Sequence, residues 1–185
     1  MRLVYRSVPA TESQPEKSKK GIYRISDFFL RFWFRYVHPY QNALDLGMAD
    51  GILAQRVRPT FEQFVSYAFE ESARSYVTRL ARKGKLSFLP ERIGSWWDQN
   101  DEIDVFAISD SERALLVGEC KWSANPVGSD ILQDLKRKTQ TLQPMKSWDN
   151  VTYFLFAKSG FTQALQEQAS IEENIHLISV EDCLI

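Results

Sequence analysis

Two neighbouring segments, residues 102–108 and 114–121, constrain the fold more than any other part of the chain. In the first, apolar residues alternate with others around Asp104, which is the two-residue period of a half-buried strand. Residues 109–112 have the composition of a turn. The second segment is a strand that ends in Glu119-Cys120-Lys121. Together they predict a β-hairpin with charged residues at its open end.

These charged residues suggest a site. Because side chains alternate across a strand, Glu119 and Lys121 project from the same face. A hairpin register can bring Asp104 beside them. Two acidic oxygen donors and an ammonium suit a hard divalent ion and the phosphate that it polarises. The alternative is a charged strand end that faces water, where Glu119 and Lys121 only make the hairpin soluble.

The clearest helix precedes these strands and ends at Gly84. Thr60 as N-cap with Gln63 three residues later predicts a capping box. Glu70 falls at the margin of the apolar stripe, where its carboxylate can reach the neighbouring sheet, whereas Glu71 points away from the core. An ordinary boundary glutamate is the alternative for Glu70. The apolar residues recur at spacings of three and four: Phe61, Phe64, Val65, Ala68, Phe69, Ala73, Tyr76, Val77 and Leu80.

The rest of the chain alternates between strand and helix patterns. Strands are predicted at 85–89, 93–98, 151–157 and 175–180. Helices are predicted at 161–171 and 181–185, and a further one is opened by residues 127–130 and includes Leu142. The nearly continuous apolar run 151–157 indicates a central strand that is covered on both faces. The order α-β-β-β-α-β-α-β predicts an α/β fold, a mixed sheet with helices on both faces, in one domain from 59 to 185.

The N-terminal residues 1–25 look like a fragment of a larger unit. Short strands at 4–8 and 21–25 flank a polar, basic loop and predict a hairpin, which is marginal in water by itself. It is consistent with the wing of a winged-helix domain. The alternative is a disordered basic terminus.

Residues 26–58 are predicted to be a helical linker. Ser26 as N-cap and Asp27 in the first turn begin a helix that stops before His38-Pro39. A connector with a short helical stretch follows. We expect this helix and the hairpin to pack on the following domain, to pair with a second copy, or to be poorly ordered.

Composition narrows the class of protein. The chain has 185 residues, is 44% hydrophobic and carries a net charge of -1, so any nucleic-acid affinity must come from local patches. Two cysteines and two histidines are too few and too scattered for a zinc site. No secretory signal is evident, and the aromatic run 28–37 is too short to span a bilayer. We expect a reduced, cytoplasmic protein.

The strand pair and its flanking helices resemble the PD-(D/E)XK nuclease superfamily, in which an Asp and a Glu-x-Lys lie across a β-hairpin. The chain also resembles the C-terminal nuclease-like domain, of unknown function, of a family of archaeal-type P-loop ATPases. In that family a nucleotide-binding domain and a winged helix come first. The motifs that carry this resemblance are residues 23–34, 67–70, 93–98, 102–104, 118–122 and 126–128.

The resemblance implies a PD-(D/E)XK-type fold and a metal-dependent DNA endonuclease. Asp104 and Glu119 would hold Mg²⁺ or Mn²⁺, and Glu70 would be an additional ligand, direct or through water. Lys121 would orient the attacking water and stabilise the charge that develops on the phosphate. Four basic residues on the surrounding helices are expected to contact the DNA backbone: Arg74, Lys136, Arg137 and Lys138.

A second function is compatible with the same fold. The chain can be an interaction or regulatory module that docks on the ATPase or on DNA and does not cleave. No Gly-x-x-x-x-Gly-Lys-Ser/Thr motif occurs, so the chain is not expected to hydrolyse ATP by that route. We expect it to be a truncated product or a segment of a longer ATPase.

Overall fold

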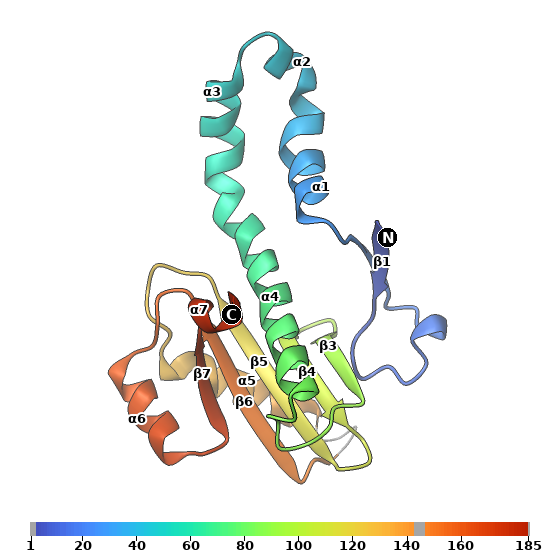
Figure 1. Cartoon of the computed structure of the whole chain (residues 1–185), viewed down its shortest axis with the longest axis vertical. Helices are drawn as coiled ribbons and strands as arrows, with labels where there is room; N and C mark the ends of the chain where they lie inside the picture. The colour runs from blue at the N-terminus through green and yellow to red at the C-terminus, as the bar shows by residue number, and fades with distance from the viewer. Residues whose placement is uncertain (1–2, 143–146, 185) are drawn as a thin grey trace.

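The chain forms a five-stranded sheet with helices on both faces, from which a long helical hairpin extends (Figure 1). The computed structural model describes residues 3–142 and 147–184. The N-terminal elements are β1 (Val4–Ser7), η1 (Pro15–Lys17), β2 (Ile22–Ile25), α1 (Phe28–Phe32), η2 (Trp33–Val37), η3 (His38–Tyr40), α2 (Gln41–Asp45), α3 (Ala49–Ile52) and η4 (Leu53–Val57). The remaining elements are α4 (Arg58–Arg82), β3 (Arg92–Trp97), β4 (Glu102–Ser109), β5 (Ala114–Lys121), α5 (Ser129–Leu142), β6 (Asn150–Ala157), α6 (Gln163–Ile171), β7 (Ile175–Ser179) and α7 (Val180–Leu184).

The sheet is mixed, with strand order β3-β4-β5-β6-β7. Strands β3, β4 and β5 are antiparallel neighbours, whereas β5, β6 and β7 run parallel. Parallel neighbours need a crossover, and the helices α5 and α6 provide the two that this sheet requires. This arrangement confirms the prediction of a mixed α/β sheet flanked by helices.

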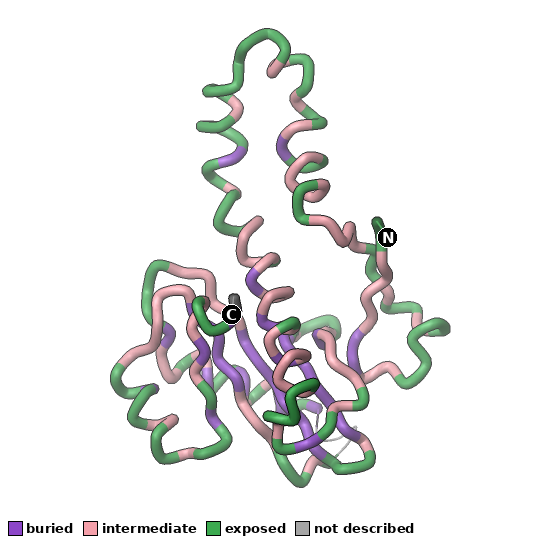
Figure 2. Tube along the Cα trace, viewed as in Figure 1, coloured by how far each residue is buried: buried purple, intermediate pink, exposed green. Residues whose placement is uncertain are grey.

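Each face of the sheet buries its own apolar cluster. Helices α4 and α7 cover one face and α5 and α6 the other, so the buried positions concentrate along the strands (Figure 2). The first cluster includes Phe69, Ala73, Val77, Val105, Ala107, Leu116, Phe156 and Cys183. The second includes Phe106, Ile108, Leu115, Val117, Leu132, Leu135, Leu155 and Leu165. Strand β4 is therefore buried on both faces, and the prediction that it is half-buried is wrong.

A β-bulge interrupts β4 at Asp104. Gly94 of β3 pairs with Phe106, but Trp96 pairs with Ile103, so three residue steps on β4 face two on β3. The residues that share this step are Asp104 and Val105. A bulge bends a strand and re-aims its side chains. The bulge therefore includes Asp104, whose carboxylate is a candidate metal ligand.

Helix α4 begins earlier than predicted. It continues without a break from α3 and η4, so its first turn has no free N–H groups for a capping box to satisfy. The Thr60 hydroxyl instead donates to the carbonyl of Arg56 (3.0 Å). The C-terminus matches the prediction: Gly84 has φ 62°, and Gly84 and Lys85 donate to the carbonyls of Ala81 and Leu80.

The N-terminal strands pair in an antiparallel hairpin, as predicted. Asp27, rather than Ser26, caps α1, because its carboxylate accepts a hydrogen bond from Leu30 N–H (2.8 Å). The helix formed by α1 and η2 ends at Val37, as predicted, and the 3₁₀ turn η3 then leads into α2. The chain then returns along α3, η4 and α4, which forms the projecting helical hairpin.

Two further boundaries differ from the prediction. Residues 85–89 form no strand, because only Phe88 among its apolar side chains is buried and Leu89 is 70% exposed. Helix α6 begins at Gln163 with Thr162 as N-cap, two residues later than expected. Helix α7 matches the predicted terminal turn, except that Ile185 lies outside the described residues. None of the described helices is both long and apolar enough to cross a membrane.

Candidate active site

Asp104 and Glu119 lie on neighbouring antiparallel strands, just beyond the last regular pair, Val105 with Gly118. Beyond that pair, hydrogen bonds to side chains take the place of the backbone hydrogen bonds between β4 and β5. The Asp104 carboxylate accepts a hydrogen bond from the N–H of Cys120 (2.8 Å), and the Asp104 carbonyl accepts one from Arg74 (2.7 Å). The two strands therefore separate at this end of the hairpin, while the N–H of Cys120 and the carbonyl of Asp104 keep hydrogen-bond partners.

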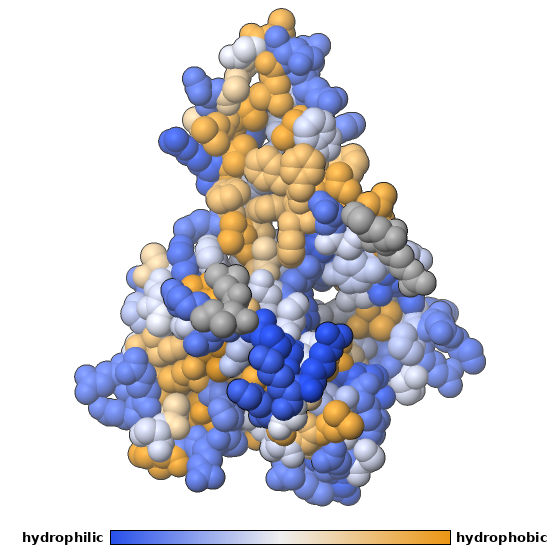
Figure 3. Space-filling view, viewed as in Figure 1, coloured by the Kyte–Doolittle hydropathy of each residue, from blue (hydrophilic) through white to orange (hydrophobic). Residues whose placement is uncertain are grey.

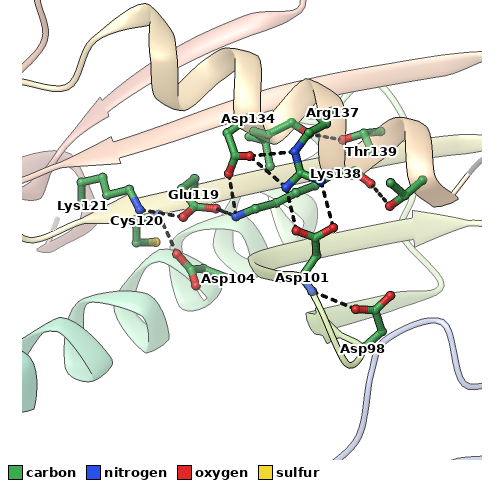
Figure 4. A network of polar contacts seen from close by, with 12 residues as sticks. Asp98, Asp101, Asp104, Glu119, Cys120, Lys121, Asp134, Arg137, Lys138 and Thr139 are labelled. Atoms are coloured by element: carbon green, nitrogen blue, oxygen red, sulfur yellow. Dashed lines mark hydrogen bonds and ion pairs between the residues drawn. The ribbon is translucent and has the colours of Figure 1, made fainter.

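Two lysines hold the carboxylate of Glu119 (Figure 4). The Lys121 ammonium lies 2.8 Å from Oε1, and the Lys138 ammonium lies 3.1 Å from Oε2. Glu119 has a side chain that is only 10% exposed, and a buried carboxylate needs such partners. Lys121 is 36% exposed, so its ammonium lies where the site meets solvent.

Lys138 was expected to contact the DNA backbone, but its side chain points into the candidate site. Its side chain is 12% exposed and also lies 3.3 Å from Asp134. Burial opposes its charge, but the carboxylates of Glu119 and Asp134 outweigh this effect, so the pKa of Lys138 is raised. The helix α5 thus supplies a second ammonium to the site.

Asp104 is the most perturbed acid at the site. Burial, and then repulsion from the carboxylates of Glu119 and Glu70, raise the pKa of Asp104 to about 7, although the Cys120 N–H opposes the shift. Burial also raises the pKa of the adjacent Cys120 thiol, which is therefore a poor nucleophile.

Glu70 lies on α4, on the other side of Asp104 from α5. Burial raises the pKa of Glu70, and the nearby carboxylate of Glu102 adds to this effect. The guanidinium groups of Arg74 and Arg24 oppose it. Its closest ionic partner is Arg74, at 3.7 Å. Within the described residues, no three His, Cys, Asp or Glu side chains are close enough to share one ion. The structure therefore places Glu70 near the site but does not make it a third direct ligand.

The basic residues predicted to contact DNA are engaged within the protein. Lys136 pairs with Glu172 (2.7 Å), and Arg74 contacts Asp104 and Glu70. Arg137 is 52% exposed and bridges Asp134 and Asp101, which ties α5 to the β3–β4 turn. Of the run 136–138, Arg137 alone is exposed.

Sequence reasoning did not find the contacts of Lys138 and Arg24 with this site. Lys138 lies within a run of charges, a pattern that normally marks a solvated helix face. Arg24 is about 50 residues from Glu70 in the chain, and only the folded hairpin brings it near. A spacing of four residues from Asp134 to Lys138 was the one available signal, and it predicts only a surface pair.

The fold and the site define a class: an α/β protein with a mixed five-stranded sheet and a partly buried cluster of two carboxylates and two lysines at one end of its central hairpin. A family model matches residues 33–139, more than half of the chain. The chain belongs to this family, DUF234, which is described as archaeal and bacterial proteins of unknown function.

One relative is an uncharacterized protein of Methanocaldococcus jannaschii. It is 34% identical over 142 residues, which cover 76% of this chain and 31% of the relative. The chain therefore spans about a third of the length of the curated relative that it matches. No solved structure matches it.

Proposed function

We propose that this chain is a nuclease-like domain of the PD-(D/E)XK type that hydrolyses DNA phosphodiesters with the help of a divalent metal ion. The observation that carries the proposal is the position of Asp104 beside Glu119, with Lys121 bonded to Glu119 at the solvent side. The order α4-β3-β4-β5-α5-β6 around this cluster supports it.

The donor chemistry fits a hard cation. Asp104 and Glu119 would hold Mg²⁺ or Mn²⁺, because both supply carboxylate oxygens and repel one another without a cation between them. Two protein carboxylates suffice, since Mg²⁺ usually keeps several of its waters. Bound there, the ion would supply charge to polarise the phosphate and lower the pKa of a water.

The residues of the chain have distinct tasks in this reaction. A water oxygen bonds to phosphorus, the bond from phosphorus to a sugar oxygen breaks, and the leaving oxygen takes a proton. Lys121, at the solvent side, donates hydrogen bonds to the phosphate oxygens as negative charge develops on them. Lys138 holds the other oxygen of Glu119 and acts as a positioning residue. Such a site needs no covalent intermediate.

The test is cleavage of plasmid and linear DNA with Mg²⁺, Mn²⁺, Ca²⁺ or EDTA. We expect cleavage with Mg²⁺ or Mn²⁺ but not with Ca²⁺, whose looser coordination positions phosphate and water poorly. Asp104→Ala and Lys121→Ala should abolish cleavage without loss of the fold. Matched controls are Glu173→Ala and Lys83→Ala, at exposed positions outside the site.

The opposite result would support the second function. A folded chain that binds DNA but does not cut it with either ion, even when an ATPase partner is supplied, would be an interaction module. In that case Asp104, Glu119 and Lys121 would only stabilise the hairpin. Circular dichroism of each variant separates loss of activity from loss of fold.

A further inference from the structure

A cleft lies between the N-terminal elements and the β3–β4 turn, beside the candidate active site. Its volume is about 820 Å³, which is within the usual range for a ligand site. One wall comes from β2, α1 and η2, the other from residues 97–102, and α4 contributes Phe64 and Tyr67. Glu102 lines the cleft two residues before Asp104, and Arg24 lines it while attracting Glu70. The cleft therefore lies next to the candidate site, although Asp104 and Glu119 do not line it.

Aromatic rings line this cleft without joining the core. Tyr23 is 73% exposed, and Phe28, Phe34 and Tyr67 are between 41% and 51% exposed. Figure 3 shows how hydrophobic side chains gather over the adjoining helical hairpin instead of being covered. Large exposed rings in a concave site mark a binding surface, because each one leaves apolar area in water.

The cleft also holds two guanidinium groups that have no carboxylate within ion-pair distance among the described residues. Among the described residues, Arg24 has no hydrogen bond or ion pair for its guanidinium, and Arg35 bonds only the neutral amide of Gln63 (3.2 Å). Arg31, in contrast, is bound by Glu71 (2.6 Å). A free guanidinium fits a phosphate group well.

The opposite wall is acidic, and one of its three carboxylates is paired with a cation. Asp98 caps its own turn by accepting from the N–H groups of Asn100 and Asp101, and the Asp101 carboxylate is paired with Arg137. Asp98 and Glu102 are the exposed acids of this wall. The guanidinium groups lie on the other wall, which carries the rings, and there they complement an anionic ligand.

We propose that this cleft binds a single strand of nucleic acid and leads it to Asp104 and Glu119. Arg24 and Arg35 contact phosphates, and the rings of Tyr23 and Tyr67 stack on bases. A ring can stack on a base only when that base has left the duplex, so the site selects single-stranded or opened nucleic acid. This inference rests on the proposed function, because it names the form of its substrate.

The test is fluorescence anisotropy with labelled oligothymidylate and oligouridylate of about ten nucleotides, and with a duplex of equal length. EDTA is present, so that neither metal nor cleavage is needed. The expected result is that at least one single strand binds about tenfold more tightly than the duplex, and the better of the two identifies the sugar.

Two variants test base stacking and phosphate binding separately. Tyr23→Ala should weaken binding of the single strand about tenfold and leave the salt dependence unchanged, because stacking is not ionic. Arg24→Met should weaken it by a similar factor and reduce the salt slope by about one phosphate contact. Matched controls are Phe29→Ala, an exposed ring of α1 outside the cleft, and Arg82→Met, at the far end of α4.

Three outcomes would overturn the inference: no binding of either strand, equal affinity for the duplex, or unchanged affinity in both cleft variants. The proposal that the cleft binds a single strand and the proposal of nuclease activity can fail independently. Binding that depends on Tyr23 and Arg24 without any cleavage would support the first and contradict the second. Metal-dependent cleavage that is unchanged in both variants would contradict the first and support the second.

Discussion

Lys138 of α5 donates to Glu119 of β5 across 3.1 Å, which connects a helix face to the end of the central strand. Because Lys121 takes the other oxygen of Glu119, the two ammonium groups fix the plane of this carboxylate. The consequence is that Glu119 keeps one orientation although β5 no longer pairs with β4 at this point and pairs only with β6. A pre-set carboxylate is what an ion or a phosphate at this site requires.

Replacing Lys138 tests this positioning role. Lys138→Met leaves one oxygen of a buried carboxylate without a partner, and we expect the free energy of unfolding to fall by about 1–3 kcal/mol. Cleavage should drop by about 10–100-fold, the usual effect of losing a residue that orients a ligand. Steady-state kinetics should show the loss in kcat more than in KM, since Lys138 does not contact substrate.

Lys138→Arg is the matched comparison. It retains the positive charge and hydrogen-bond donors at this position, so it should recover most of the stability and part of the activity. Wild-type kcat in Lys138→Met would contradict the positioning role, even if that variant melts at a lower temperature.

The pKa of Asp104 predicts an unusual dependence of stability on pH. Its folded value of about 7 lies above the ordinary 3.8, so the folded state binds more protons than the unfolded state between these values. The contribution of Asp104 to the free energy of unfolding therefore decreases as pH rises through this range. Asp104→Asn keeps an acceptor for Cys120 N–H but cannot ionise. In EDTA it should be more stable than wild type near pH 8, by on the order of a few kcal/mol, and lose this advantage near pH 4.

Addition of a metal ion should reverse the order of stability of wild type and Asp104→Asn. Mn²⁺ in excess stabilises only the form that binds it, so it should raise the Tm of wild type and leave that of Asp104→Asn unchanged. Thermal melts at both pH values, with and without Mn²⁺, provide the measurement. A variant that is less stable than wild type near pH 8 in EDTA would contradict a raised pKa of Asp104.

Gly118 is predicted to tolerate no side chain. A Cβ at this position would lie 3.0 Å from the Cβ of Val105, 3.1 Å from the ring of Phe156 and 3.2 Å from the carbonyl of Phe154. These atoms belong to the neighbouring strands and cannot all move, so Gly118→Ala should cost about 1–3 kcal/mol. Urea unfolding measures this loss, and Gly51→Ala, where the added Cβ meets no atom within 4 Å, is the control.

The order of the elements was predictable because each pattern reflects burial that is local to its own segment. The two-residue and three-to-four-residue periods identified β4, β5, α4 and α5. Element ends were less predictable. Thr60 has the residue type and spacing of an N-cap, but α4 continues upstream and leaves no N–H group to cap.

The candidate site was only partly predictable for a similar reason. Asp104, Glu119 and Lys121 are close in sequence and share one hairpin, so strand geometry alone suggests that they meet. Lys138 and Arg24 reach the site from other elements, and no period or spacing predicts where α5 and the β1–β2 hairpin dock. The polar alternation around Asp104 was also misleading, because the strand becomes apolar on both faces only from Val105 onward.

The helical hairpin should loosen independently of the sheet. Phe64 of α4 packs against the rings of Phe32 and Tyr36, with centroids 6.0 and 5.6 Å away, and the Tyr36 hydroxyl bonds Thr60. Phe64→Ala removes the ring that joins the two arms, so amide hydrogen exchange over residues 28–40 should accelerate by about tenfold or more. Exchange in β4, β5 and β6 should stay at the wild-type rate, because their core lies on the other half of α4. Phe61→Ala, at a 43% exposed ring of the same helix, is the control. Faster exchange throughout the sheet would show instead that the hairpin and the core unfold as one unit.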